Sequence, residues 1–179
     1  ELTYFPQPRE AVRTPDDLQK IKGSTIKAMV PGNVELDMLA AGIIEDPMIG
    51  NNVYSLRKYE GYQWCYSKKF PTPEVKEDEY VKIFFGGIDC FADIWLNDQL
   101  VGSVDNMLIE HEFDITKYLK KGGENDLQVI IRSSVLEAQK YFLGTFSIGN
   151  FANEESVYVR RAPHTYGWDI MPRLVSAGL

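Results

Sequence analysis

Polar and hydrophobic residues alternate along much of the chain after about residue 62, and this two-residue period is typical of β-strands with one buried face. In Phe91–Leu96, for example, Ala92 and Ile94 share one face while Asp93 lies on the other. Near residue 130 the same pattern places Arg132 on the outward face. Turn-forming residues separate six such segments, which we predict to be strands: Gln63–Phe70, Tyr80–Phe85, Phe91–Leu96, Leu100–Val104, Ile109–Asp114 and Asp126–Ile131.

Helical patterns are few and short. Asn33–Ala41 has a capping residue at its start and Gly42 just past its end, so it predicts a helix. Asp114 is a candidate cap for a single helical turn that follows it. Ser134–Tyr141 is a weaker helical candidate. Many short strands with one or two short helices indicate an all-β fold, an antiparallel sandwich or barrel. We expect one domain over residues 1–179.

One tight turn is predicted within this pattern. Asn97 and Asp98 stand between two strand segments, and both residue types tolerate the left-handed backbone of a two-residue hairpin. We therefore expect the strands on either side to form a β-hairpin.

Composition excludes two classes of partner. The chain carries 26 acidic and 19 basic residues, a net charge of −7. Nucleic acid is excluded as a partner because binding to phosphates needs a basic face. No apolar run approaches the length of a membrane span, so we expect no membrane partner.

The two cysteines and two histidines predict no metal site. Cys65 and Cys90 both lie in apolar strand patterns, which is consistent with one disulfide or with two buried thiols, and the buried thiols are favoured. Neither His111 nor His164 stands at a zinc-like spacing from them. We expect no metal and no cofactor.

The segment from Arg160 to Arg173 concentrates the chemistry of the chain. It contains a Trp, an Asp, a Tyr, a His and three Arg, and Gly and Pro residues indicate a loop. An aromatic ring beside a carboxylate suits a sugar, because the ring covers the apolar face of a pyranose and the carboxylate accepts hydrogen bonds from its hydroxyls. The alternative is a packing loop in which Trp168 fills a hydrophobic gap and Arg173 pairs with Asp169.

Several motifs, taken in order, resemble the β-mannosidase-type members of glycoside hydrolase family two. The resemblance covers almost the whole chain after about residue 25, and the order of the motifs is more specific than any one of them. They are Val30–Leu39, Gly42–Asn52, Tyr62–Pro71, Phe85–Asn97, Phe113–Thr116, Asn125–Val129, and Gly167–Asp169 with Pro172 and Arg173.

The resemblance implies a fold and a place in a larger enzyme. The chain would be the N-terminal jelly-roll, galactose-binding-like domain, often called sugar-binding. An immunoglobulin-like domain and a (β/α)₈ barrel would follow, and the barrel carries both catalytic glutamates of the retaining mechanism. We therefore expect no catalytic residue here, and we expect a longer protein because Val175–Leu179 begins an apolar element that stops. Secreted or periplasmic enzymes of this type are common, which favours such a location.

By the same resemblance, four residues are expected to serve the sugar subsite. Asp169 would accept hydrogen bonds from the sugar, Trp168 would form an apolar wall, and Arg173 would orient Asp169. Asn51 lies in a second loop that similar enzymes direct toward the pocket, although its residue type favours a turn.

The neighbours of these residues are expected to have supporting roles. His164 and Tyr166 should support the loop. His111 should be a hydrogen-bonded core or edge residue. Glu154 and Glu155 should be solvated, and their adjacency excludes them as a catalytic pair.

Departures from the family pattern bear on specificity. β-Mannosidases usually have Trp-Asp-Trp-Gly-Pro-Arg where this chain has Ile170 and Met171 in place of the second Trp and the Gly. Asn52 stands where many relatives have Glu. A related glycone other than mannose is therefore plausible. Two further hypotheses are a self-sufficient lectin-like module and a purely structural domain of the hydrolase.

Overall fold

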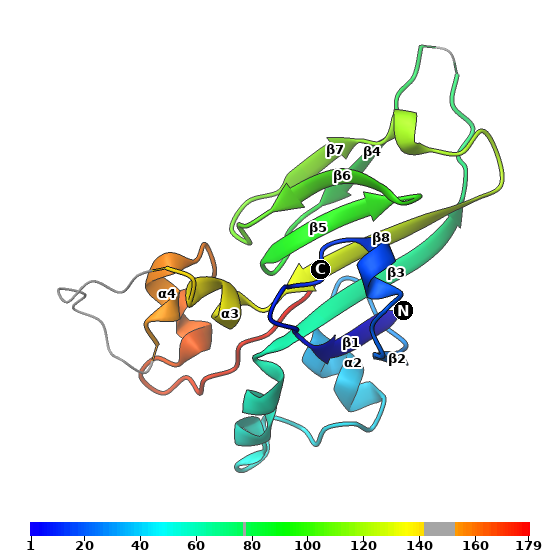
Figure 1. Cartoon of the computed structure of the whole chain (residues 1–179). Helices are drawn as coiled ribbons and strands as arrows, with labels where there is room; N and C mark the ends of the chain where they lie inside the picture. The colour runs from blue at the N-terminus through cyan, green and yellow to red at the C-terminus, as the bar shows by residue number, and fades with distance from the viewer. Residues whose placement is uncertain (77, 142–152) are drawn as a thin grey trace.

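The computed structural model describes residues 1–76, 78–141 and 153–179. Six antiparallel strands form one large sheet in the order β2-β1-β3-β8-β5-β6, and two more form a small sheet, β4-β7 (Figure 1). The strands are β1 (Leu2–Pro6), β2 (Ser24–Ile26), β3 (Tyr62–Pro71), β4 (Lys82–Phe85), β5 (Phe91–Leu96), β6 (Gln99–Val104), β7 (His111–Asp114) and β8 (Glu124–Arg132). The predicted all-β antiparallel architecture is confirmed.

The helices are short and lie mostly around the sheets. The longest α-helix of the described residues has seven residues, and no described helix has the length and apolar character needed to cross a membrane. The α-helices are α1 (Pro15–Leu18), α2 (Val34–Ala40), α3 (Ser134–Ala138) and α4 (Glu155–Tyr158). The 3₁₀ helices are η1 (Asn52–Tyr59), η2 (Thr116–Tyr118) and η3 (Pro163–Tyr166).

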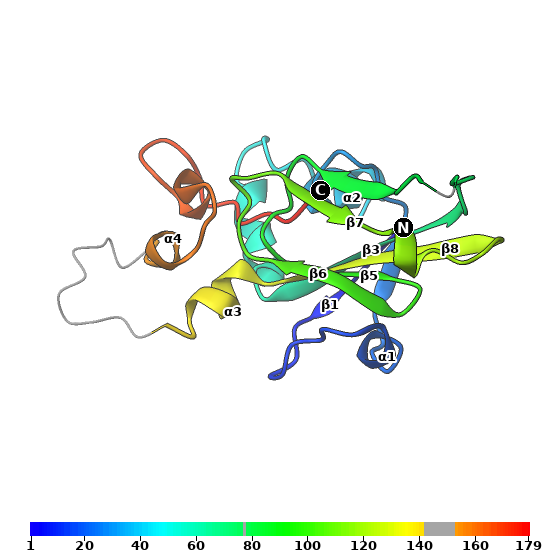
Figure 2. The same ribbon diagram turned by 90° about the horizontal axis from the view of Figure 1, so that it is seen from above.

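The main core lies between the large sheet and the layer formed by β4, β7 and α2 (Figure 2). The faces predicted from alternation are correct for this layer: Ala92, Ile94 and Leu96 are fully buried. Ile83 and Phe85 of β4 also face the core. Burial of such side chains is the main stabilising contribution to a sandwich of this kind.

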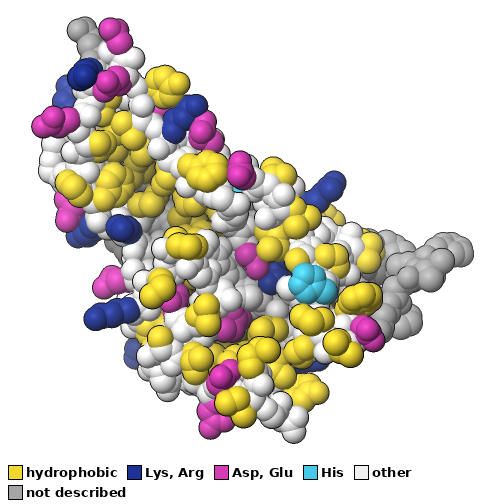
Figure 3. Space-filling view, turned by 180° about the vertical axis from the view of Figure 1, so that it is seen from behind, with side chains coloured by type: hydrophobic (Ala, Val, Ile, Leu, Met, Phe, Trp, Pro, Cys, Tyr) yellow, Lys and Arg dark blue, Asp and Glu magenta, His cyan; other side chains and the backbone are white. Residues whose placement is uncertain are grey.

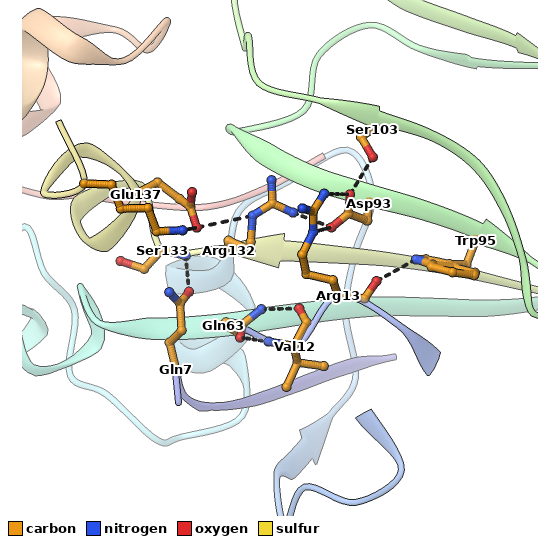
Figure 4. Close-up of polar contacts among 11 residues, drawn as sticks. Gln7, Val12, Arg13, Gln63, Asp93, Trp95, Ser103, Arg132, Ser133 and Glu137 are labelled. Atoms are coloured by element: carbon orange, nitrogen blue, oxygen red, sulfur yellow. Dashed lines mark hydrogen bonds and ion pairs between the residues drawn. The ribbon is translucent and has the colours of Figure 1, made fainter. Parts of the chain in front are cut away.

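The opposite face of the large sheet is also covered, which alternation alone did not indicate. Residues 7–14, which form no helix or strand, act as a strap on this face, where Gln7, Val12 and Arg13 lie (Figure 4). The backbone N–H of Val12 donates to Oε1 of Gln63, and Nε2 of Gln63 donates to the Val12 carbonyl, both at 2.8 Å. The indole N–H of Trp95 donates to the Arg13 carbonyl at 2.8 Å. These bonds fix the strap to the sheet.

Asp93 is the centre of an ionic network beneath the strap (Figure 4). Arg13 donates to both carboxylate oxygens at 2.9 and 2.8 Å, and Ser103 donates to Oδ1. Arg132 contacts the same carboxylate and, at 3.4 Å, Glu137. Burial raises the pKa of Asp93, but hydrogen bonds from Arg13 and Ser103 outweigh burial and lower it overall. Arg132 lies on the face opposite the main core, as predicted, but it is 8% exposed and not solvated, and its charge is paired with Asp93 and Glu137.

Most predicted elements are present, with boundaries shifted by a few residues. Asn97 and Asp98 have φ values of 52° and 60° and form the predicted hairpin turn between β5 and β6. Asn33 caps α2 by accepting a hydrogen bond from Leu36 N–H. Cys65 and Cys90 are buried and free, which confirms the buried thiols. The elements that were missed are β1, β2, α1, η1, α4 and η3.

The end of the chain returns to the middle of the sandwich (Figure 1). Gly178 lies antiparallel to Asn33 on one side and to Asp89 on the other. Gly32 N–H donates to the Leu179 carbonyl at 2.9 Å, and Asp89 N–H donates to the Gly178 carbonyl at 3.0 Å. The last residues therefore occupy a strand position between the segment before α2 and the segment after β4.

Candidate functional site

The described part of the loop that carries the predicted sugar residues belongs to a small lobe beside one end of the large sheet. α3, α4 and η3 form this lobe, and residues 167–175 lead from it back to the sandwich (Figure 1). Phe91, Val135 and Tyr166 are among the residues of a second hydrophobic cluster that joins the lobe to β5. The loop therefore rests on a packed base.

Arg161 anchors the base through charge-assisted hydrogen bonds. Its side chain is fully buried, with Nε 2.6 Å from Oδ1 of Asp89 and Nη2 2.8 Å from Oδ2. The guanidinium also donates to the Ser176 carbonyl at 3.0 Å and contacts Thr165. Burial lowers the pKa of Arg161, but pairing with Asp89 more than offsets this and raises it overall. This bidentate geometry ties together three chain segments that are far apart in sequence.

Tyr166 packs between two guanidinium groups. Tyr166 is 1% exposed, with Cζ of Arg161 at 5.2 Å and Cζ of Arg173 at 5.5 Å from its ring centroid. Both distances are typical of cation–π contacts. The expected supporting role of Tyr166 fits this geometry.

Arg173 does not orient Asp169 as we expected. It binds Glu60 through Nε at 2.9 Å and Nη2 at 2.8 Å, and Glu155 through Nη1 at 3.1 Å and Nη2 at 2.8 Å. Burial lowers the pKa of Arg173, but these carboxylates raise it overall. The expectation that Glu155 is solvated was wrong as well, because Arg173 holds it. Arg173 is a structural clamp between η1, α4 and the loop.

Trp168 and Asp169 lie in a tight turn that projects from this base. Trp168 N–H donates to the Met171 carbonyl at 3.2 Å, and Met171 N–H donates to the Trp168 carbonyl at 2.7 Å. Asp169 has a φ of 49°, in the left-handed region that Asp tolerates better than most residues. We call residues 168–171 the tip turn. Trp168 is 67% exposed and Ile170 is 89% exposed.

The tip turn presents a ring and a carboxylate to solvent. No hydrogen bond or ion pair among the described residues occupies the carboxylate of Asp169. An ionised carboxylate accepts hydrogen bonds only, so it suits the hydroxyl groups of a sugar. The exposed face of Trp168 adds a flat apolar surface with a polar N–H at one edge. The two residues are adjacent on one rigid support, so one ligand can contact both.

Asn51 lies elsewhere, at the start of η1, and it is exposed. Its backbone carbonyl accepts from Tyr54 N–H at 3.1 Å, as expected for a turn residue. No hydrogen bond among the described residues joins Asn51 to the tip turn. A connection between the two regions does exist at the other end of η1, where Glu60 binds Arg173.

Neither histidine lies in a predicted binding site. His111 is hydrogen-bonded through Nε2 to the Asn106 carbonyl at 2.8 Å. This confirms the prediction that it is a hydrogen-bonded residue of a strand. His164 is exposed. Within the described ranges, no group of three or more His, Cys, Asp or Glu side chains is arranged to hold a metal ion.

Sequence reasoning missed the residues that support the tip turn. Glu60 and Asp89 gave no signal, because each stands in a segment with ordinary strand or turn composition. Their roles depend on partners 113 and 72 residues away. The sequence indicated this region only through Arg161 and Arg173, which lie in a run rich in charged and aromatic residues.

Comparison with known sequences identifies the family. Residues 14–179 match the family of domains described as glycosyl hydrolase 2 galactose-binding domain-like. The chain is 33% identical over 153 residues to β-mannosidase B of Emericella nidulans, covering 84% of this chain and 18% of that protein. It is 34% identical over 151 residues to β-mannosidase B of Thermothelomyces thermophilus, covering 83% and 18%.

Comparison with solved structures also finds a β-mannosidase. The crystal structure of the β-D-mannosidase from Dictyoglomus thermophilum matches with a TM-score of 0.76 and 31% sequence identity, covering 99% of this chain and 20% of that chain. The present chain thus spans about a fifth of the length of these relatives.

Proposed function

Because the chain belongs to the glycosyl hydrolase 2 galactose-binding domain-like family, we propose that it is the N-terminal accessory domain of a retaining exo-β-glycosidase of the β-mannosidase type. In this proposal the tip turn forms one wall of the subsite for the terminal sugar. The observation that carries it is the contrast between an exposed Trp168–Asp169 pair and a base held by buried charges.

The base supports this proposal because binding groups must be held rigidly to discriminate between ligands. Arg161 and Arg173 each bind carboxylates from distant segments, and Tyr166 fills the space between them. A packing loop in which Trp168 fills a hydrophobic gap needs the same base, so the experiment below is chosen to separate it from a sugar subsite. Trp168 and Asp169 together offer the apolar ring and the hydrogen-bond acceptor that a pyranose needs.

The roles within the subsite follow from the chemistry of the two side chains. Asp169 accepts hydrogen bonds from glycone hydroxyls, and Trp168 covers an apolar face of the sugar. Arg173 acts indirectly, by holding the returning chain in place. Asn51 has the weakest support, since its exposed position at the start of η1 is not linked to the tip turn.

The chemical step belongs to another part of the longer protein. Retaining glycosidases use two carboxyl groups about 5 Å apart, one as acid and base and one as nucleophile. The tip turn offers a single carboxylate, so the proposal assigns both catalytic groups to a domain beyond this chain. In this proposal they lie on a (β/α)₈ barrel, as the family resemblance implies. The substrate is a β-glycoside, and mannose is one candidate for its terminal sugar.

The test is hydrolysis of a panel of aryl β-glycosides by the longer protein, as wild type and as Asp169→Asn. Asn tolerates the left-handed backbone, so the turn is preserved while the charge is lost. We expect kcat/KM on the best substrate to fall about a hundredfold, about 3 kcal/mol of transition-state stabilisation. The matched control is Asp98→Asn, the same change at an exposed turn residue with a φ of 60°. It should leave kcat/KM unchanged.

Two outcomes would contradict the proposal. If Asp169→Asn and Asp98→Asn behave alike, the domain is a scaffold. If the 179-residue chain binds the same glycosides on its own, it is a self-sufficient lectin-like module.

A further inference from the structure

A small polar cavity lies beside the base of the loop that carries the tip turn. Its volume is about 10 Å³, close to the space that one water molecule needs. It differs from the broad hollow on the face shown in Figure 3, where hydrophobic side chains gather. Dry cavities in proteins are apolar, whereas charged residues and serines are prominent in this lining. They are Glu60, Asp89, Arg132, Ser133, Ser134 and Ser176.

Ser134 brings an unpaired hydroxyl to the cavity. It is the first residue of α3 and is 6% exposed. Its Oγ has no hydrogen-bond partner among the described residues. The adjacent Ser133 differs, because its Oγ accepts a hydrogen bond from Leu136 N–H and donates one to the Glu60 carbonyl. Buried hydroxyls in folded proteins are nearly always hydrogen-bonded, so Ser134 calls for a partner.

Tyr166 contributes a second unpaired hydroxyl close to the first. The residue is 1% exposed, and its OH has no hydrogen-bond partner of normal geometry among the described residues. Burial raises the pKa of Tyr166, whereas its neighbours Ser134 and Arg161 lower it. The two hydroxyls are therefore near each other without a direct hydrogen bond, an arrangement that a bridging water satisfies.

Asp89 supplies a fixed acceptor in the same lining. Its two carboxylate oxygens each accept one hydrogen bond from Arg161, at 2.6 and 2.8 Å. An ionised carboxylate has about four acceptor sites, so Asp89 can accept a further hydrogen bond. Buried water molecules make about three hydrogen bonds each. Ser134, Tyr166 and Asp89 together offer that number.

We propose that one ordered water molecule binds in this cavity and joins the hydroxyls of Ser134 and Tyr166 to the Asp89–Arg161 ion pair. The water accepts a hydrogen bond from each hydroxyl and donates one to the Asp89 carboxylate. It connects α3, η3 and the segment that follows β4. The base of the loop is then held by a hydrated bridge in addition to its direct ion pairs. The inference rests on the cavity and its hydroxyls and not on the proposed sugar subsite.

A high-resolution crystal structure of the chain tests the proposal directly. We expect the density of one water molecule within hydrogen-bonding distance of Ser134 Oγ and Tyr166 OH. Ser134→Val places methyl groups where the hydroxyl lies, so it should fill the cavity and remove this density. The wild-type density decides the matter even if the variant does not fold.

The stability of Tyr166→Phe provides a second measurement. Removing a hydroxyl that has no partner should leave the unfolding equilibrium unchanged or favour the folded state, because no hydrogen bond is lost. Removing a hydroxyl that binds the water should raise the unfolding equilibrium constant about fivefold. Urea denaturation measures this constant. Tyr54→Phe is the matched control, because Tyr54 is 66% exposed and its hydroxyl is accessible to solvent, and it should change the constant less than about twofold.

The proposal is wrong if the wild-type density shows no water between the two hydroxyls, whether they bond to each other directly or the cavity is dry. It is also wrong if Tyr166→Phe is as stable as the wild type, since the water would then not bind Tyr166. Neither result depends on whether Asp169 contacts a sugar.

Discussion

At the scale of single residues, Arg173 is the side chain whose partners matter most for the loop. It is 8% exposed and pairs with Glu60 and Glu155, which are 14% and 17% exposed. Removing it leaves two carboxylates close together without a counter-charge. We predict that Arg173→Ala lowers the free energy of unfolding by about 2 kcal/mol, between the values for exposed and fully buried pairs. Urea denaturation of the chain measures this.

Two other variants control for the Arg173 prediction. Arg173→Lys keeps the charge but cannot bind both carboxylates in a bidentate manner, so we expect an intermediate loss. Lys140→Ala removes an exposed pair with Glu137 and should cost less than about 0.5 kcal/mol. A loss for Lys140→Ala equal to that for Arg173→Ala would contradict the clamp.

Glu35 gives the chain a pH dependence of a defined sign. It is 9% exposed and hydrogen-bonded to Ser176, and burial raises its pKa despite this hydrogen bond. The folded state therefore binds the proton more tightly than the unfolded state does. This contribution to stability is fully present below the unfolded pKa and is lost as the pH rises through the folded pKa.

The corresponding prediction concerns Glu35→Gln, which keeps a polar partner for Ser176 without a titratable charge. Its free energy of unfolding, relative to wild type, should increase from pH 4 to pH 7. Denaturation at several pH values checks this. A difference that stays constant with pH would show that burial of Glu35 does not favour its neutral form.

At the scale of elements, α2 depends on its N-terminal cap. Oδ1 of Asn33 accepts a hydrogen bond from Leu36 N–H at 3.0 Å, and the helix buries Val34 and Met38 in the main core. We predict that Asn33→Ala lowers the free energy of unfolding by about 1 kcal/mol, whereas Asn33→Asp retains the cap and most of the stability. Thermal unfolding of both variants tests this, and equal losses would exclude capping as the cause.

Local alternation predicts the faces of a strand but not whether another segment covers them. Alternation identified the buried face of β5 correctly, since Ala92 and Ile94 contact the core. The same pattern placed Asp93 and Arg132 on the opposite face but did not indicate that the face is covered. That coverage comes from residues 7–14, which precede β5 by about 80 residues. Alternation predicts which side chains share a face of the sheet. Whether that face is exposed to solvent depends on residues 7–14, which are distant in sequence.

At the scale of the whole molecule, the two thiols report global unfolding. Burial raises the pKa of both Cys65 and Cys90 to about 12. Since only the thiolate reacts, neither should react with a disulfide reagent at pH 8 in the folded chain. Both should react once urea unfolds it, with the same midpoint as the loss of structure. Rapid reaction of one thiol under native conditions would instead indicate local opening around it.

The sequence by itself determined the strand and turn pattern, the capped helix α2 and the ordered motifs that carry the family resemblance. These are local properties: strand periodicity, the left-handed tolerance of Asn97 and Asp98, and the side-chain acceptor of Asn33. The tertiary structure alone decided that Arg173 binds Glu60 and not its neighbour Asp169, and that the chain end lies beside β4. Such contacts depend on how distant segments are brought together, because local propensity does not encode which remote carboxylate a guanidinium meets.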